Sequence, residues 1–412
     1  MSRPYTISGI DIGNSQVKVV IARVGDNSRP EILGTGSAES KGLRRGMVVD
    51  MEETIDNVRS AIQQAEAMAG THIKKAFVAV NGLHIKTQVS KGVIAVSRAD
   101  NEISQNDIER VIQAASVVSM PANREIVHVI PRNFVVDGTE YVKNPLGMKG
   151  VRLEADVVII DGLSPYLRNM AKCVNENDVE VSGLVYAPLA ASLSSLDKIQ
   201  KEHGVVNLDF GGGTSTLAVF EEADLIHSAV IPVGSKHITN DLAVALRTSL
   251  DIAERVKIEH CSTSNVEDMR RRENIDLSGL MKEENFVMPK KQLVKVVDAR
   301  INELLDIVES ELKKVSKSGI LPAGVVLSGG GSNLPGFALL VKDRLRLPVK
   351  VAEPLGFDGA NNIVGDPSFA VAVGLVLWGT TEAQNGRKTQ RVSLGEDGVI
   401  SKIVGWLKNF LP

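Results

Sequence analysis

The sequence is poor in cysteine and nearly balanced in charge. Two cysteines, Cys173 and Cys261, occur among 412 residues, which excludes a disulfide framework or a cysteine zinc cluster and favours a reducing cytoplasm. Lys and Arg number 47 and Asp and Glu number 50, so the net charge of −3 argues against a chain-wide nucleic-acid footprint. No apolar run approaches the ~18 residues that span a bilayer. Residues 1–12 lack a long apolar core, so we expect no signal peptide.

Several motifs of common enzymes are also missing. No GK[ST] triplet marks a Walker A loop, and no GxGxxG precedes a helix. The seven histidines show no HxxxH or HxH spacing for a metal. Aromatic residues make up 4% and apolar residues 43%, with many β-branched and small side chains, as is typical of α/β proteins. At ~100–200 residues per domain, the length predicts two to four units.

Two segments share a strand–glycine turn–strand pattern. Residues 5–11 and 17–24 are predicted strands on either side of Gly13-Asn14-Ser15, and residues 31–36 are a candidate third strand. A second cycle begins at residue 205, in VVNLDFGGGTSTLAVF. Asp11 and Asp209 each end an apolar strand just before the turn, so the two units look like an approximate internal repeat. A third glycine turn, GGGS at 329–332, follows the strand 325–328.

The remaining segments predict helices and a separate small unit. Apolar residues between 51 and 68 recur on one helical face, which ends at Gly70, and a strand follows at 76–80. Residues 84–162 break this rhythm with several strands, including 126–130 and 134–136, and a helix near 104–118 that begins with a Ser104/Asp107 capping box. Helices are also predicted at 164–175, 238–256 and 291–315, and residues 381–398 resemble a polar linker.

Glycine turns after strands suit phosphate binding. Such a turn points several backbone N–H groups at one anion, and glycine lets phosphate oxygens approach closely. Two facing turns could grip a triphosphate, while Asp11 and Asp209 could hold a hydrated Mg²⁺, which takes few carboxylates and keeps its waters. One such turn alone is weak evidence, whereas three in this order, two of them with Asp, are stronger together.

In these motifs the sequence resembles a known family. The order DIGNSQVK, DFGGGTS and LSGGGSNLPG resembles the actin-like ATPase superfamily, and the closer resemblance is to the FtsA family of bacterial cell-division proteins. It extends through SKGLRRGMVVDMEETIDNVRSAIQQAE, HVIPRNFVVDG, NPLGMKGVRLE and VGSKHITNDLA to the tail, so it covers nearly the whole chain. The resemblance implies a two-lobed, actin-like α/β fold with an inserted α+β subdomain. It also implies an ATP-binding protein that polymerises, ties FtsZ filaments to the cytoplasmic face of the inner membrane at the division site, and recruits other division proteins.

The resemblance also implies a division of the chain and a set of ligands. The first lobe would comprise residues 1–83 and 164–200, the insertion 84–163, and the second lobe 201–380 with its outer part at 238–316. Residues 381–397 would be a flexible linker and residues 398–412 a membrane-targeting helix. ATP and Mg²⁺ are the implied ligands, with Asp11 and Asp209 contacting the metal through water. The implied nucleotide contacts are Gly13, Asn14, Ser15, Lys18, Gly211, Gly212, Gly213, Thr214, Ser215, Glu254, Lys257, Gly329, Gly330, Gly331 and Ser332.

Three sequence features bear on ATP hydrolysis, on nucleotide contact and on the partner. Hydrolysing relatives carry Glu before Pro-x-Ala-Ala, where this chain has Ala187; a general base typically contributes ~10²–10⁴-fold, so we expect weak or no ATP turnover. Without the family resemblance, Glu254 and Lys257 would be interpreted as an ordinary i,i+3 surface pair. Arg270–Arg272, Lys290, Lys291 and Arg300 lie where the family receives the partly acidic C-terminal peptide of FtsZ, and they are candidates for a charged rim.

The C-terminal segment is amphipathic. Around 15 residues give a helix of ~22 Å, too short for a ~30 Å hydrocarbon core, so it would lie in the headgroup plane of an anionic membrane. The alternative is a terminal helix docked on the protein's own core, but the polar linker favours a tethered element. The predicted membrane contacts are Ile400, Ile403, Val404, Trp406, Leu407, Phe410 and Leu411.

Two other functions share this fold. A PilM-type pilus assembly ATPase has the same fold and insertion, but an apolar tail helix after a linker is not expected there. A small-molecule kinase of the same superfamily needs an Asp general base in a substrate pocket, and the sequence points to none.

Overall fold

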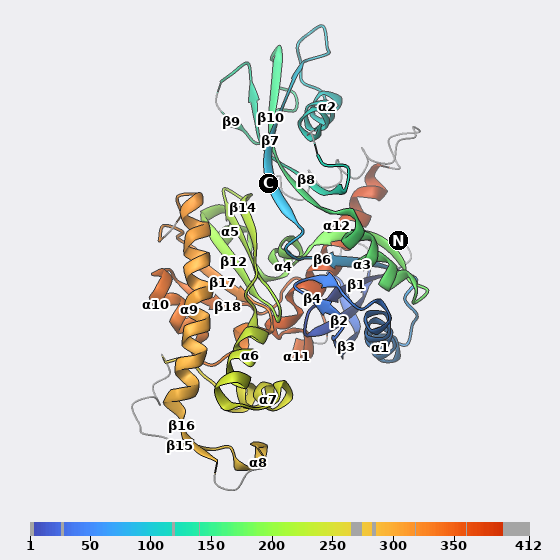
Figure 1. The fold of residues 1–412 in the computed structure, drawn as a ribbon. Helices are drawn as coiled ribbons and strands as arrows, with labels where there is room; N and C mark the ends of the chain where they lie inside the picture. Colours follow the sequence, from blue (N-terminus) through green and yellow to red (C-terminus); the bar gives the residue numbers. More distant parts are fainter. Residues whose placement is uncertain are drawn as a thin grey trace.

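The structure is a computed structural model that describes residues 4–25, 29–117, 120–139, 141–264, 274–281, 286–317, 319–359 and 361–389. These residues form two lobes, each built on a five-stranded sheet, and a smaller sheet that projects from the first lobe at the top of Figure 1. Short two-stranded pairs, β4 (Leu43–Arg44) with β5 (Met47–Val48) and β15 (Asn274–Asp276) with β16 (Val287–Pro289), complete the pairing.

The two five-stranded sheets have the same topology. In each, three strands form an antiparallel meander and two more continue the sheet in parallel. The first sheet has the order β3 (Glu31–Glu39), β2 (Gln16–Val24), β1 (Tyr5–Ile12), β6 (Lys75–Val80) and β11 (Glu180–Tyr186). The second has the order β14 (Asp224–Ile231), β13 (Ser215–Glu221), β12 (Val205–Phe210), β17 (Val325–Ser328) and β18 (Val349–Val351). The predicted internal repeat is therefore confirmed as a repeat of topology.

The inserted unit is a four-stranded sheet with one helix. Its strands lie in the order β7 (Lys86–Ala95), β10 (Arg152–Leu163), β8 (Arg124–Val136) and β9 (Tyr141–Val142), and α2 (Gln105–Ser116) packs against them. The Ser104/Asp107 capping box of α2 is confirmed. The two strands predicted at 126–130 and 134–136 are one strand, β8, because its pairing with β10 continues through two irregularities in register.

Helices of the first lobe follow the predicted pattern closely. Helix α1 (Met51–Ala69) begins at Asp50, whose side chain accepts from the N–H of Glu53, and it ends at Gly70, whose φ of 64° suits glycine. Helix α3 (Ser164–Asn175) agrees with the predicted 164–175. Helix α4 (Ala187–Ser195) follows β11 and contacts strands of both five-stranded sheets, so it lies between the lobes (Figure 1).

The last described helix corrects the predicted domain division. Residues 370–380 were assigned to the second lobe, but α12 (Ala370–Thr389) packs against β1, β2 and α4 of the first lobe. Gly374 makes this possible, because a Cβ atom there would lie 1.8 Å from the carbonyl oxygen of Ala190 on α4. Helix α12 also extends through residues 381–389, where the sequence predicted a linker. Helix α12 joins the first lobe through contacts between residues far apart in the chain, which no local sequence pattern shows.

The second lobe carries the longest helix. Helix α9 (Lys290–Lys314) agrees with the predicted 291–315, whereas the single helix predicted at 238–256 is two, α6 (Ser235–Leu246) and α7 (Leu250–His260). The break falls at Arg247, whose φ of 51° ends α6, before Ser249 caps α7. The remaining elements are α5 (Lys198–His203), α8 (Ser278–Met281), η2 (Gly330–Asn333), α10 (Phe337–Leu345), α11 (Asn361–Val364) and η3 (Pro367–Phe369).

Two predictions concern segments that the structure does not describe. The rest of the predicted linker and the membrane contacts between Ile400 and Leu411 lie outside the described residues, as do Arg270–Arg272. Across the part of the chain that is described, no helix has both the length and the apolarity to cross a bilayer.

Candidate functional site

A cleft of about 140 Å³ lies where the two lobes meet, and three glycine-containing turns line it. These are the β1–β2 turn of the first lobe, the β12–β13 turn of the second lobe and the turn from β17 into η2. Most of the residues predicted to bind the nucleotide or its metal gather here. Those lining the cleft are Asp11, Gly13, Asn14, Ser15, Lys18, Asp209, Gly211, Gly212, Thr214, Gly329, Gly330 and Gly331.

The two lobes make the same turn from similar residues. Gly13 N–H donates to the carbonyl of Gln16 at 3.0 Å, and Gly211 N–H donates to the carbonyl of Thr214 at 3.1 Å. A Cβ atom on either glycine would lie 2.8 Å from that same carbonyl oxygen. Glycine is therefore required at both positions for the same steric reason.

The two turns also touch each other across the cleft. A Cβ atom at Gly212 would lie 2.0 Å from the hydroxyl oxygen of Ser15, and one at Gly213 would lie 2.6 Å from Cγ of Asn14. Side chains at these positions would push the lobes apart. The glycines thus let two loops from different lobes close around one small ligand group.

Two half-buried aspartates and one buried lysine face the cleft. Asp11 and Lys18 are paired across β1 and β2, and Asp209 accepts a hydrogen bond of 3.0 Å from the hydroxyl of Ser328. Burial raises the pKa of Asp11 to about 7, with Lys18 opposing the shift and Asp209 adding to it. Burial also raises the pKa of Asp209. The Lys18 ammonium donates to the Ser368 carbonyl at 2.9 Å, and burial lowers its pKa.

This arrangement fits a nucleotide with Mg²⁺. The described residues contain no cluster of three or more His, Cys, Asp or Glu side chains that would cage a metal. Two half-buried carboxyl groups with raised pKa values instead suit a cation that keeps several waters and takes other oxygens from phosphates. The opposed turns would offer backbone N–H groups to those phosphates. Asp11 and Asp209 would orient the hydrated metal, and the bound metal would neutralise phosphate charge.

Three predicted contacts shape the loops from behind the cleft. The hydroxyl of Ser215 donates to the carbonyl of Val233 at 2.6 Å, and the hydroxyl of Ser332 donates to the carbonyl of Gly329. Gly213 lies against Asn14, as described above. Gly213, Ser215 and Ser332 are outside the cleft lining, and the two serine hydroxyls hold the turns. The contact of these three residues with a nucleotide stays a prediction.

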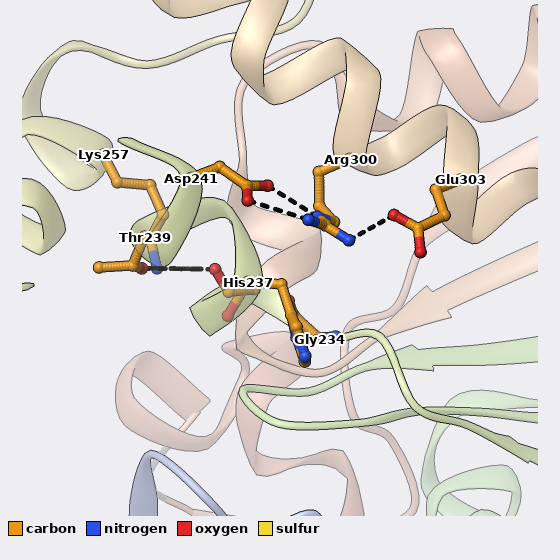
Figure 2. A network of polar contacts seen from close by, with 8 residues as sticks. Gly234, His237, Thr239, Asp241, Lys257, Arg300 and Glu303 are labelled. Atoms are coloured by element: carbon orange, nitrogen blue, oxygen red, sulfur yellow. Dashed lines mark hydrogen bonds and ion pairs between the residues drawn. The ribbon is translucent and has the colours of Figure 1, made fainter. Parts of the chain in front are cut away.

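Glu254 and Lys257 also lie outside the cleft lining, in a polar network. Figure 2 shows Lys257 of this network beside Thr239. The Lys257 ammonium is 2.7 Å from Oε2 of Glu254 and donates to the hydroxyl of Thr239 at 2.9 Å. The i,i+3 pair thus ties α7 to α6. Their contact with a nucleoside stays a prediction.

Arg300 does not belong to a free charged rim. Its guanidinium binds both carboxylate oxygens of Asp241 on α6, at 2.7 and 2.9 Å, and also contacts Glu303 (Figure 2). A two-pronged contact of this kind is directional and holds α9 against α6. Lys290 and Lys291 lie at the start of α9.

The cleft includes residues that sequence reasoning missed. Gly46, Asn81, Ser235 and Ser368 line it, and the Lys236 ammonium donates to the carbonyl of Asn14 at 2.8 Å. These residues come from segments without a phosphate-loop pattern of their own, so most of them could not be recognised from the sequence. The glycine before α6, in VGSK, was the one local indication.

Ala187 is the first residue of α4, and it lines the cleft. This is where a general base for ATP hydrolysis would have to lie. An alanine there offers no group that could orient or deprotonate a water. Weak turnover therefore stays the expectation.

The fold and the cleft together define an actin-like protein, with two lobes of repeated topology around one ligand cleft. Solved structures share this fold at low identity. The PilM–PilN type IV pilus biogenesis complex matches with a TM-score of 0.66 and 17% identity over 91% of this chain and 98% of that chain. MreB 5 of Spiroplasma citri bound to AMPPNP matches with a TM-score of 0.57 and 14% identity over 94% and 99%. These likenesses establish the fold alone.

Sequence comparison is more specific. Residues 82–161 match the model of the SHS2 domain inserted in FtsA, and residues 206–374 match that of cell division protein FtsA. FtsA of Bacillus subtilis is 37% identical over 92% of this chain and 84% of its own length. FtsA of Pseudomonas aeruginosa is 35% identical over 92% and 90%, and that of Escherichia coli K12 is 31% identical over 98% and 97%. The chain belongs to the FtsA family of cell division proteins.

These findings confirm the family and the fold class predicted from the sequence. The match of residues 82–161 coincides with the small sheet and α2, so the projecting unit is the insertion of this family. The PilM alternative shares the fold but lacks comparable sequence similarity.

Proposed function

We propose that this chain is an ATP-binding, actin-like membrane adaptor of cell division. It binds ATP with Mg²⁺ between its lobes, polymerises, and links FtsZ filaments to the cytoplasmic face of the membrane at the division site. There it acts as a peripheral protein that recruits other division proteins. Its output is mechanical, with weak or no ATP hydrolysis.

The observation that carries the nucleotide part is the pair of matching turns around Asp11 and Asp209. Each lobe contributes one turn and one half-buried carboxyl group, and a ligand held by both would join the lobes. Binding energy from such a ligand favours the closed form, since a ligand shifts an equilibrium toward the state that it binds better. ATP would thereby select one lobe arrangement for assembly.

Family membership supports the FtsZ and membrane parts. Relatives named cell division protein FtsA align along nearly the whole chain, with 98% of it covered in the longer matches. One short amphipathic helix with two lysines binds a membrane modestly, but a polymer that presents many copies gains avidity without new contacts. Assembly and membrane residence would then be coupled.

A co-sedimentation experiment tests this function. The full chain is mixed with liposomes containing anionic lipid and with an FtsZ, with and without ATP and Mg²⁺. We expect FtsZ to pellet with the liposomes when the chain and ATP are both present, and an FtsZ truncated at its C-terminal peptide to stay in solution. FtsZ that stays in solution when the chain, ATP and liposomes are all present, or truncated FtsZ that pellets as well as the full-length protein, would refute the adaptor function.

The tail is tested by a double substitution. Replacing Ile403 and Leu407 with Glu places two charges on the predicted apolar face. Charges at a helix centre cost about 2.5–3.5 kcal/mol each at the bilayer core, and half of that for both residues predicts a roughly hundred-fold weaker membrane partitioning. Replacing Ser401 and Asn409 with Glu adds the same charge to the polar face, so it should weaken binding far less. A double variant on the apolar face that still pellets with liposomes would show that the tail is not the anchor.

A further inference from the structure

Lys236 contacts both phosphate-loop candidates at once. It is the second residue of α6, and its backbone N–H donates to the carbonyl of Gly212 in the second-lobe turn at 2.8 Å. Its ammonium crosses the cleft to the carbonyl of Asn14, at 2.8 Å, although the two residues are 222 positions apart. One side chain therefore bridges the two turns, and with them the two lobes, beside the cleft.

The helix that carries Lys236 is firmly held. Gly234 N–H donates to Nδ1 of His237 at 3.1 Å at the start of α6, and Thr239 hydrogen-bonds Lys257 on α7. Further along, Asp241 receives the fork of Arg300 from α9 (Figure 2). These braces come from two other helices, so the position of the α6 N-terminus is fixed by the fold. The Lys236 side chain can move while its backbone stays in place.

The Lys236 ammonium is a solvent-exposed cation beside the cleft. Lys257 is in contact with Glu254, whereas Lys236 makes no ion pair within 4.0 Å in the described ranges and donates to a neutral carbonyl. Glu39 and Glu254 attract it only at longer range. Hydrogen bonds between charged groups are shorter and roughly twice as strong as those with neutral acceptors. Exchange of the Asn14 carbonyl for a phosphate oxygen is therefore favourable.

The cleft lining itself contains few positive charges that could balance a bound nucleotide. Within the described part of the chain, the charged side chains that line the cleft are Asp11, Asp209 and Lys18. Two potential carboxylates against one ammonium leave little to balance a nucleotide beyond what Mg²⁺ supplies. A triphosphate carries one more negative charge than a diphosphate. A further cation beside the cleft therefore stabilises a bound triphosphate more than a bound diphosphate.

We propose that Lys236 distinguishes a nucleoside triphosphate from a diphosphate, by releasing the Asn14 carbonyl and binding the terminal phosphate. The inference rests on the proposed nucleotide binding and adds a specificity-determining residue to it. In the released state the lobes would be joined through the ligand instead of through the Lys236–Asn14 hydrogen bond. The contact that holds the lobes together would then differ between the triphosphate-bound and the diphosphate-bound protein.

The test compares four full-length proteins: the wild type, Lys236→Met, Lys236→Arg and Lys198→Met. Lys198 is an exposed lysine in the first turn of α5, so its substitution is matched for charge and helix position. Affinities for ATP and for ADP, each with Mg²⁺, are measured by calorimetry, and melting curves without nucleotide check the fold. A charged hydrogen bond contributes ~1.5–3 kcal/mol, which predicts a ~10–100-fold loss.

We expect Lys236→Met to lose that factor for ATP while its ADP affinity changes less than about threefold. Lys236→Arg should keep most of the ATP preference, and Lys198→Met should behave as the wild type. An equal loss for both nucleotides would overturn the proposal, because it would mean that Lys236 only holds the Asn14 loop. Unchanged affinities would also overturn it while leaving nucleotide binding intact. A wild type that binds neither nucleotide would instead refute the proposed function itself.

Discussion

Substituting Asp11 by Asn should stabilise the protein at alkaline pH while weakening its ligand site. Burial raises the pKa of Asp11 from 3.8 to about 7, so keeping this group ionised in the folded state is unfavourable. At about 1.4 kcal/mol per pKa unit, this shift corresponds to about 4 kcal/mol above pH 7. An amide of the same shape carries no charge and removes that cost.

The sign of the pH dependence follows from linkage. Because the folded pKa lies above the unfolded value, the folded state binds more protons between pH 4 and 7. Wild-type stability should therefore fall as the pH rises through this window, and the Asp11→Asn variant should lack that part of the fall. The variant and the wild type should have similar stability near pH 4, where the carboxyl group is protonated in both states.

The gain will be smaller than the full cost, since Lys18 loses a neighbouring opposite charge. If about half remains, the unfolding free energy at pH 8 rises by about 2 kcal/mol, which corresponds to several degrees in melting temperature. The assay is urea unfolding at pH 5 and pH 8 with a chelator present. The control is Asp358→Asn, an exposed position that should show little change.

The same variant should respond differently to ligand. If Mg²⁺ and ATP bind as proposed, they should stabilise the wild type by mass action, and the variant should lose much of that gain because one proposed metal-facing carboxylate is absent. Equal stability of Asp11→Asn and wild type at pH 8, with the same pH slope, would refute the conclusion that a half-buried carboxylate is held in the cleft at a cost to folding.

Three further predictions concern the cleft and the lobe contact. Asp209→Ala should lower ATP affinity in calorimetry when Mg²⁺ is present and have less effect when Mg²⁺ is chelated; an unchanged affinity would contradict its role at the metal. Phosphate release by the wild type should be near background, and Ala187→Glu should raise it; fast Mg²⁺-dependent release by the wild type would favour a hydrolysing enzyme. Gly374→Ala should destabilise by about 1–3 kcal/mol in urea unfolding, because its Cβ would lie 1.8 Å from the Ala190 carbonyl oxygen. Gly279→Ala should not destabilise the protein, because the added Cβ meets nothing within 4 Å. Equal unfolding free energies of the two variants would contradict the conclusion that Gly374 is needed for the contact with α4.

The sequence by itself determined the elements that depend on local chemistry. Alternating apolar residues and glycine turns predicted β1, β2, β12, β13 and β17, and the acidic residues at the strand ends marked the ligand cleft. A helical period between residues 51 and 68, with Gly70 at its end, predicted α1 within a residue or so. These elements can be predicted from the sequence because the hydrogen bonds of each turn and cap are made by residues only a few positions away.

Tertiary structure decided the features that depend on distant partners. Residues 370–389 are helical and join the first lobe because Gly374 lets α12 approach α4, which no local period announces. Arg300 became a brace rather than a rim because Asp241 lies opposite it once α6 and α9 pack. Lys236 reaches Asn14 only when the two lobes have closed on each other. In each case the deciding contact joins residues far apart in the chain, so its partner is specified by the packing of whole elements and not by the residues beside it.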